Sequence, residues 1–331
     1  MGPCDRAFQP RPGSRVTEGA GVQLGLIGLG KMGGNMAERV RRAGHEVVGF
    51  DHHPERRDVD SVPALVEALS APRIVWVMVP SGEPTRATVK ELVDLLQPGD
   101  VIVEGGNSKY TDDQVHDVMC REKGIGYVDA GVSGGVWGLE NGYALMVGGT
   151  AEDVAKVQPI FDALKPPAPA DESGQAMPGA GFVHAGPVGA GHFSKMVHNG
   201  IEYALMQAYG EGYELLTAVD LVEDVPGVMA SWTQGTVIRS WLLDLLVRAL
   251  DEDPALERVR GYAEDSGEGR WTVEQAIENA VPMPTIAASL FARFSSRQDD
   301  SPTMKAVAAL RNQFGGHTVR AVEQAEAERP A

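Results

Sequence analysis

The sequence predicts an α/β fold, in which a Rossmann-like, doubly wound sheet in the N-terminal half is followed by an all-α domain. Two observations favour this fold. From residue 22 to residue 164, short apolar runs alternate with stretches of helical periodicity, which is typical of a parallel sheet covered by helices. After Gly191, helical patterns dominate and strand-like alternation almost disappears. A chain of 331 residues is long enough for two domains with separate cores.

The sheet-forming half opens with a β-α-β unit. Residues 22–28 form a short apolar run that ends in glycines and predicts a buried strand, and residues 32–43 have helical character. Residues 45–50 predict the second strand. Further strands are expected at 74–79, 101–103, 127–128 and 143–148, with helices at 85–96, 111–122 and 152–164.

The second half is predicted to be helical. Several prolines between residues 165 and 181 indicate a loop or linker. Helical patterns follow at 191–219, 221–251, 271–279, 283–294 and 302–314. We therefore expect a disordered extension at 1–21, a nucleotide-binding domain at 22–187 with a proline-rich insertion at 165–180, and a helical domain at 188–331 that ends in a C-terminal tail.

Composition excludes several classes of protein. The charge balance of 29 basic against 46 acidic residues gives −17, which argues against a general nucleic-acid surface and against binding to anionic membranes. No apolar run approaches the length needed to span a bilayer. The two cysteines, Cys4 and Cys120, form no disulfide framework, so the sequence favours a cytoplasmic protein.

A glycine motif lies between the first strand and the first helix. Residues 28–33 read G-x-G-x-x-G, and this placement predicts a turn whose backbone N–H groups bind a dinucleotide pyrophosphate at the helix N-terminus. The expected cofactor contacts are Gly28, Leu29, Gly30, Lys31, Met32, Gly33, Asp51, Val79 and Asn107.

Asp51 ends the second strand and bears on the choice of cofactor. A carboxylate here can accept hydrogen bonds from the adenosine ribose and repel a 2′-phosphate, and no Arg or Lys follows until Arg56 and Arg57. The sequence therefore favours NAD over NADP. An aspartate that only caps the turn after the strand is the alternative interpretation.

Four polar side chains share one face of the helix predicted after Gly191. His198, Asn199 and Glu202 follow Lys195 at offsets of 3, 4 and 7, which are neighbouring positions at 3.6 residues per turn. An amine, an imidazole, a carboxamide and a carboxylate on one stripe suit proton transfer. The alternative is an ordinary exposed polar face.

Three other segments offer ligand-binding groups. Ser133, Gly134 and Gly135 follow one strand and can hold a carboxylate with a hydroxyl and backbone amides, and Asn107 follows the preceding strand in the same way. Residues 311–317 end a helix in glycines and carry a guanidinium and an imidazole.

With these motifs the chain resembles the 6-phosphogluconate dehydrogenases, specifically their short, NAD-preferring bacterial form, over about residues 22–320. The resemblance is carried by G-A-G-H-F-S-K-M-V-H-N-G-I-E-Y at 189–203, V-S-G-G-V-W-G-L-E-N-G at 132–142 and R-N-Q-F-G-G-H-T at 311–318. It implies oxidation and decarboxylation of 6-phosphogluconate to ribulose 5-phosphate in the pentose phosphate pathway, with NAD reduced and no metal required.

The resemblance also implies roles for individual residues. Lys195 would be the general base for the 3-hydroxyl and Glu202 the acid that protonates C1 of the enediol, while His198 and Asn199 orient hydroxyls. The substrate-binding residues implied at its carboxyl and phosphate ends are Ser133, Gly134, Gly135, Asn107, Tyr203, Arg239, Arg311 and His317.

The chain departs from the long members of the family in two respects. Ser266 stands where those members carry a lysine in a glycine-rich loop, and Arg270 nearby is one possible substitute. The chain also lacks their duplicated helical half, so we expect a homodimer or homotetramer in which the helical domain mediates association. Arg311 and His317 would then contribute to the site of another subunit.

Two other functions stay open at this stage. A related β-hydroxyacid dehydrogenase of the 3-hydroxyisobutyrate type shares the nucleotide fold and a catalytic lysine, but its small substrate does not require His198, Glu202 or the arginine–histidine tail. A non-catalytic NAD-sensing module on the same fold is the second alternative, and Lys195 with Glu202 argues against it.

Overall fold

The computed structural model describes residues 21–169, 179–315 and 318–319. The chain folds as two compact units, which divide between His192 and Phe193, a few residues after the domain boundary expected between 187 and 188. Three expected segments lie largely outside the described residues. They are the N-terminal extension apart from Gly21, most of the proline-rich insertion, and most of the C-terminal tail.

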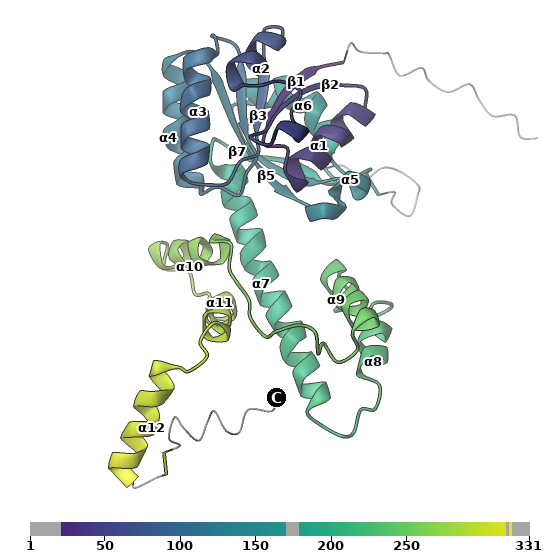
Figure 1. The fold of residues 1–331 in the computed structure, drawn as a ribbon, viewed down its shortest axis with the longest axis vertical. Helices are drawn as coiled ribbons and strands as arrows, with labels where there is room; N and C mark the ends of the chain where they lie inside the picture. Colours follow the sequence, from purple (N-terminus) through teal and green to yellow (C-terminus); the bar gives the residue numbers. More distant parts are fainter. Residues whose placement is uncertain (1–20, 170–178, 316–317, 320–331) are drawn as a thin grey trace, which may run out of the picture. The chain divides into compact units, whose positions relative to one another are not determined.

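The first unit is built on a seven-stranded sheet with the order β2-β1-β3-β4-β5-β6-β7 (Figure 1). Chain order reverses beside β1, as the doubly wound topology requires. The strands are β1 (Gln23–Ile27), β2 (Glu46–Phe50), β3 (Ile74–Val77), β4 (Val101–Glu104), β5 (Gly126–Ser133), β6 (Ala144–Gly149) and β7 (Phe182–Gly186).

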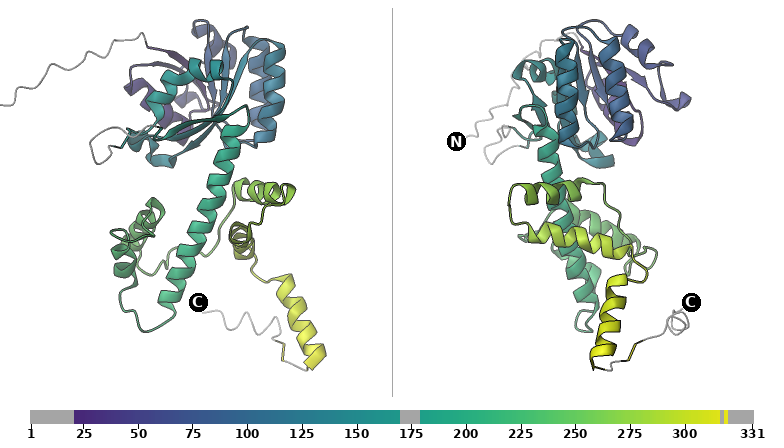
Figure 2. Two further views of the ribbon diagram at one scale, coloured as in Figure 1. Left: turned by 180° about the vertical axis from the view of Figure 1, so that it is seen from behind. Right: turned by 90° about the vertical axis from the view of Figure 1, so that its left-hand side faces the viewer.

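Helices cover both faces of this sheet (Figure 2). Buried side chains of α1 and α6 pack on one face and those of α2, α3 and α4 on the other, giving two separate apolar cores. The bounds are α1 (Lys31–Arg42), α2 (Val62–Ala68), α3 (Glu83–Leu95), α4 (Tyr110–Glu122), α5 (Gly138–Asn141) and α6 (Ala151–Leu164), with short 3₁₀ turns η1 (Pro54–Arg56) and η2 (Gly135–Trp137).

The last two strands of the sheet, β6 and β7, differ from the prediction. β6 runs antiparallel to β5, because the short segment between Ser133 and Ala144 cannot form the crossover that parallel pairing needs. Strand β7, parallel to β6, was not predicted: most of its side chains are exposed, so it lacks an apolar run. Helix α2 was also missed, although Ser61 caps it by accepting from the Ala64 N–H.

The second unit consists of helices. The long helix α7 (Ala190–Thr217) contains the division between the units. The other helices are α8 (Val225–Ser231), α9 (Trp241–Glu252), α10 (Glu268–Glu278), α11 (Pro284–Ser296) and α12 (Pro302–Gly315). None of the helices in the described ranges is long and apolar enough to cross a bilayer.

The predicted helical stretch at 221–251 is two helices. Residues 232–240 separate α8 from α9 and are not helical. Gly235 in this segment has a φ of +73°, and the Ser240 hydroxyl starts α9 by accepting from the Leu243 N–H. Arg239 therefore lies in a loop and not on a helix.

Candidate active site

The glycine motif forms the expected turn between β1 and α1. Gly28 has a φ of +94°, and a Cβ on Gly33 would lie 1.9 Å from the Gly28 carbonyl oxygen, so both positions require glycine. A Cβ on Gly30 would meet no atom within 4 Å. Gly30 caps α1 without a side-chain hydrogen bond, so its neighbourhood has room for a ligand at the helix N-terminus. These features fit a dinucleotide pyrophosphate.

Asp51 connects the end of β2 to this turn. Its carboxylate accepts from the Leu29 N–H at 2.7 Å and from the His53 N–H at 2.8 Å. Partial burial opposes ionisation, but these two bonds lower the pKa of Asp51 below its usual value. Asp51 therefore caps this turn, as the alternative interpretation expected. Its contact with the ribose of a cofactor stays a prediction. Turn η1 also brings Arg56 close enough to act on Asp51 electrostatically, which the sequence alone did not indicate.

The other residues predicted in the first unit follow the carboxyl ends of neighbouring strands. Val79 comes two residues after β3, and Asn107 three residues after β4. Ser133 ends β5, and Gly134 and Gly135 continue into η2 with φ values of +142° and +55°. Because β1 to β5 are parallel, all these segments share one edge of the sheet, where doubly wound folds bind ligands.

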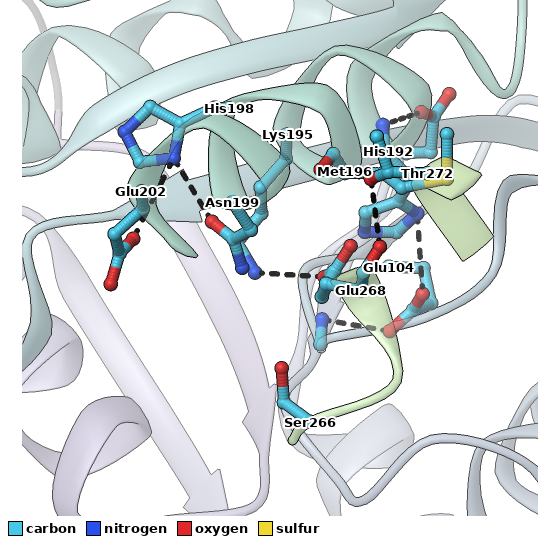
Figure 3. A network of polar contacts seen from close by, with 12 residues as sticks. Glu104, His192, Lys195, Met196, His198, Asn199, Glu202, Ser266, Glu268 and Thr272 are labelled. Atoms are coloured by element: carbon cyan, nitrogen blue, oxygen red, sulfur yellow. Dashed lines mark hydrogen bonds and ion pairs between the residues drawn. The ribbon is translucent and has the colours of Figure 1, made fainter. Parts of the chain in front are cut away.

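The four polar residues of the second unit lie along α7, as the spacing predicts (Figure 3). The His198 Nδ1 is 2.9 Å from the Asn199 Oδ1 and 4.0 Å from a Glu202 oxygen. Lys195 is buried, and its Nζ donates to the Glu268 Oε1 at 3.3 Å. Glu268 belongs to α10 and was not predicted as a site residue.

A cavity of about 390 Å³ opens beside this face of α7. Asn199, Glu202, Tyr203 and Arg293 are among its lining residues, together with Ser266 of the loop before α10. Carboxylate, carboxamide, phenol and guanidinium groups around one opening can bind a polar, anionic ligand.

Arg293 is the cation among the lining residues of this cavity, and no motif in the sequence identifies it. Its guanidinium lies 3.5 Å from the centroid of the Tyr203 ring and donates to the Glu264 carbonyl at 3.0 Å. Arg270, considered above as a substitute for the missing lysine, makes two hydrogen bonds to Asp265 at 2.9 and 3.0 Å and does not line the cavity.

Two residues assigned to the phosphate by resemblance are not among the lining residues of this cavity. Arg239, in the loop before α9, and Arg311, on α12, are exposed and do not line it. His317 lies outside the described residues. Tyr203 is the predicted phosphate residue that the cavity contains.

A buried charged cluster in the first unit was not predicted. The His192 Nδ1 is 2.7 Å from the Asp113 Oδ2 and 3.6 Å from the Glu104 Oε2. Burial disfavours the charged ring, but Asp113 and Glu104 outweigh it and raise the pKa of His192 to about 10. Burial raises the pKa of Glu104 to about 7, although His192 opposes that shift.

Further hydrogen bonds fix the cluster to the start of α7. The Asp129 carboxylate accepts from the N–H groups of Gly189 at 2.7 Å and His192 at 2.8 Å. The Tyr127 hydroxyl donates to Asp113 at 2.9 Å. His192 is part of the motif at 189–203, but spacing along the chain does not reveal its partners, the nearest of which in sequence lies 63 residues away.

Glu104, Asp113 and His192 also place three potential metal ligands within 4.8 Å of one another, among the residues that the structure describes. Sequence spacing did not show this group. A direct hydrogen bond joins His192 to Asp113, so a metal is not needed to hold these two side chains together. The expectation that the protein uses no metal stays a prediction.

The fold and these sites define an NAD-binding protein of the dehydrogenase class. A family model described as the NAD binding domain of 6-phosphogluconate dehydrogenase matches residues 23–166, and one described as the 6-phosphogluconate dehydrogenase C-terminal domain matches residues 191–313. The chain belongs to the 6-phosphogluconate dehydrogenase family, as its similarity to a whole relative also shows.

That relative is a protein of Haloferax volcanii named 6-phosphogluconate dehydrogenase, NAD(+)-dependent, decarboxylating. It is 42% identical over 308 residues, which cover 90% of this chain and 98% of the relative. A solved structure of Plasmodium falciparum 6-phosphogluconate dehydrogenase, studied with NADP+ and with 6-phosphogluconate, has a TM-score of 0.72 and 26% identity. That alignment covers 90% of this chain and 66% of the Plasmodium chain.

The 3-hydroxyisobutyrate alternative shares the fold. The Mycobacterium tuberculosis 3-hydroxyisobutyrate dehydrogenase structure, solved with L-serine, has a TM-score of 0.65, with 88% of this chain and 99% of that chain covered. At 22% identity this likeness concerns the fold alone.

Proposed function

We propose that the chain oxidises and decarboxylates 6-phosphogluconate to ribulose 5-phosphate with reduction of NAD, an activity of the pentose phosphate pathway. The observation that carries this proposal is the single face of α7 on which Lys195, Asn199 and Glu202 lie, in a chain that contains both domains of the family. Intact proton-transfer groups argue against a non-catalytic NAD sensor.

The polar groups of α7 would carry out the proton transfers. The nicotinamide of bound NAD supplies the hydride acceptor. Lys195 takes the proton of the 3-hydroxyl at its Nζ as the hydride leaves C3, and returns it to the carbonyl oxygen as carbon dioxide is lost. Glu202 then protonates C1 of the enediol while the enol O–H gives its proton to Lys195, and transfer of this proton to Glu202 restores both groups. His198 bonds Asn199 and approaches Glu202, so it would hold both groups toward the hydroxyls of the substrate.

The substrate phosphate would bind in the cavity that contains Arg293. A guanidinium stacked on Tyr203 retains N–H donors for phosphate oxygens, and the Ser266 hydroxyl lines the same opening. Arg293 would thus supply the positive charge that the long members of the family obtain from a lysine where this chain has Ser266. Ser133, Gly134, Gly135 and Asn107 remain the proposed contacts for the carboxyl end.

The finer properties of the cofactor site are also proposals. Asp51 favours NAD over NADP, because a 2′-phosphate would approach its carboxylate. Arg56 weakens that argument, since it is a cation close to the same position. We further propose that the protein is cytoplasmic and that its chemistry needs no metal.

Association into a homodimer or homotetramer is supported by the surface of the helical unit. Large apolar side chains are exposed there, among them Leu221, Val237 and Ile277 at 88%, 99% and 75%. Such apolar exposure indicates a surface that another subunit covers. We propose that the domain at 188–331 binds substrate and mediates this association, with Arg311 and His317 serving the site of a neighbouring subunit.

The decisive experiment measures NADH formation by the purified protein with 6-phosphogluconate, gluconate and 3-hydroxyisobutyrate, and repeats each assay with NADP. We expect turnover with 6-phosphogluconate and NAD, together with equimolar carbon dioxide. Lys195→Met should lower that turnover by at least about a hundredfold. Turnover of 3-hydroxyisobutyrate alone would select the alternative enzyme, and NAD binding without any turnover would favour the sensing module.

A further inference from the structure

A buried carboxylate lies directly against the proposed general base. Glu268 is the first residue of α10 and is only 1% exposed, and its Oε1 is 3.3 Å from the Lys195 Nζ (Figure 3). It follows Gly267, whose φ of +92° turns the chain into the helix. Both partners belong to the second unit, so one folded body holds the pair together.

Close packing of α7 against α10 fixes this distance. The Thr272 hydroxyl donates at 2.8 Å to the Met196 carbonyl, one residue after Lys195. A Cβ on Gly200 would lie 2.8 Å from the Thr272 side chain, and one on Gly269 would lie 2.5 Å from the Tyr203 ring. Two glycines therefore let the helices approach, and Glu268 cannot withdraw from Lys195 without disturbing that contact.

The pair poses a chemical problem. A general base must be a neutral amine when it takes the proton of the substrate, but a carboxylate beside it stabilises the ammonium form. In a buried site, two opposite charges can be replaced by two neutral groups if the proton crosses the hydrogen bond between them. Glu268 is the group in position to receive that proton.

We propose that Glu268 is the proton acceptor that makes Lys195 a neutral base. The inference rests on the proposed function, because it assigns a partner to its base. Within this buried pair an N–H bond of the ammonium breaks and an O–H bond forms on Glu268, so no proton leaves the protein. The amine then takes the 3-hydroxyl proton while the hydride passes to the nicotinamide. Lys195 gives up the substrate proton in the later steps, and when the product leaves, the proton on Glu268 returns to the neutral amine.

Other titratable groups of the helical unit surround the pair. His198, Glu202 and Tyr203 lie on the following turns of α7. Asp265, just before α10, is bound by Arg270 and Arg297, which lower its pKa against the effect of burial. Glu268 contacts the Lys195 Nζ in an ion pair.

The proposal predicts a change in pH dependence that a purely structural role would not produce. Proton transfer within the pair leaves its proton count unchanged, so kcat/KM of the wild type should vary little between about pH 6.5 and pH 8.5. In Glu268→Gln the ammonium must lose its proton to solvent. Its kcat/KM should fall at least about tenfold at pH 7 and rise about tenfold per pH unit toward the wild-type value. Glu268→Asp should restore the flat profile in part.

Two controls complete the experiment. Glu274→Gln removes an exposed carboxylate from the same helix and should leave the profile unchanged. Circular dichroism establishes that each variant folds. If Glu268→Gln keeps a flat profile, with normal or uniformly reduced activity, Glu268 does not accept the proton and the proposal is overturned.

A substrate-free measurement separates this inference from the proposed function. Reductive methylation of Lys195 by formaldehyde and cyanoborohydride, quantified by peptide mass spectrometry, reports the neutral amine. Its rate should be nearly independent of pH in the wild type and should rise with pH in Glu268→Gln. If 6-phosphogluconate is not turned over, the proposed function fails, whereas equal pH dependence of labelling in both proteins would refute the role of Glu268.

Discussion

The imidazole Nδ1 of His192 lies 2.7 Å from the Oδ2 of Asp113, and both side chains are completely buried. The Oε2 of Glu104 lies 3.6 Å from the same nitrogen, and Asp129 accepts from the backbone N–H of His192. A protonated ring among these carboxylates joins β4, β5 and α4 to the first turn of α7. Lys195 follows His192 by three residues in that helix.

We predict that His192→Gln destabilises the protein by about 3–5 kcal/mol near neutral pH, because it leaves buried carboxylates without their cation. The pKa of His192 in the folded protein, about 10, lies above the unfolded value of about 6.5. The stabilisation is therefore complete below about pH 6.5 and is lost as the pH rises through about 10. Urea unfolding at pH 6.5, 8 and 10 should show the wild type and variant converging. A constant difference would contradict a charged ring.

The same cluster allows a test for metal. If hydrogen bonds alone hold Glu104, Asp113 and His192 together, prolonged treatment with a chelator should change neither the melting temperature nor the rate of NAD reduction. Elemental analysis of the untreated protein should find less than stoichiometric metal. Loss of stability on chelation that one divalent cation restores would instead identify the cluster as a metal centre.

Periodicity predicted most of the fold because the buried strands β1, β3 and β4 are short apolar runs, and α1 has a clear apolar stripe. It did not predict β7, whose residues are mostly exposed, or the direction of β6, which depends on the length of its connection.

The site was predictable where a motif is local. The sequence alone shows that Lys195, Asn199 and Glu202 are spaced along one helix face. It also shows the glycines at 28–33 between a strand and a helix. Glu268 pairs with Lys195 across 73 residues, and Asp113 pairs with His192 across 79. Contacts over such distances depend on how helices pack, and no local pattern records them. The sequence also did not identify Arg293, because a single arginine in an amphipathic helix is usually a solvated charge.

Arg293 provides a test of phosphate recognition. Arg293→Ala should raise KM for 6-phosphogluconate about tenfold to a hundredfold, since it removes charge-assisted hydrogen bonds. The Kd for NAD should change little. Arg293→Lys should recover only part of the affinity, because lysine lacks the planar donor fork that stacks on Tyr203. Unchanged KM in both variants would place the phosphate elsewhere.

The cofactor preference can be tested at Asp51 and Arg56. The wild type should have a higher kcat/KM for NAD than for NADP, and Asp51→Ser with His52→Arg should narrow or reverse the ratio. Arg56→Ala should increase the preference for NAD, because the positive charge of Arg56 acts on the Asp51 carboxylate and would attract a 2′-phosphate. A wild type that uses NADP as well as NAD would show that the carboxylate does not govern selection.

The last prediction concerns Arg311, which is exposed on α12 and does not line the cavity that contains Arg293. If a neighbouring subunit supplies it, Arg311→Ala should raise KM for 6-phosphogluconate strongly while barely affecting NAD binding. Lysine should replace it poorly, since it cannot form a bidentate pair with phosphate.

Mixing subunits tests whether Arg311 acts between chains. At 6-phosphogluconate concentrations well below the raised KM, the Lys195→Met and Arg311→Ala proteins should each have little activity on their own. A hybrid dimer would assemble one site with both an intact Lys195 and an intact Arg311, so co-refolded mixtures should recover part of the wild-type activity. Native mass spectrometry of the two variants, one of them isotopically labelled, measures how many hybrids form. If hybrids form and no activity returns, Arg311 serves its own chain or does not bind phosphate.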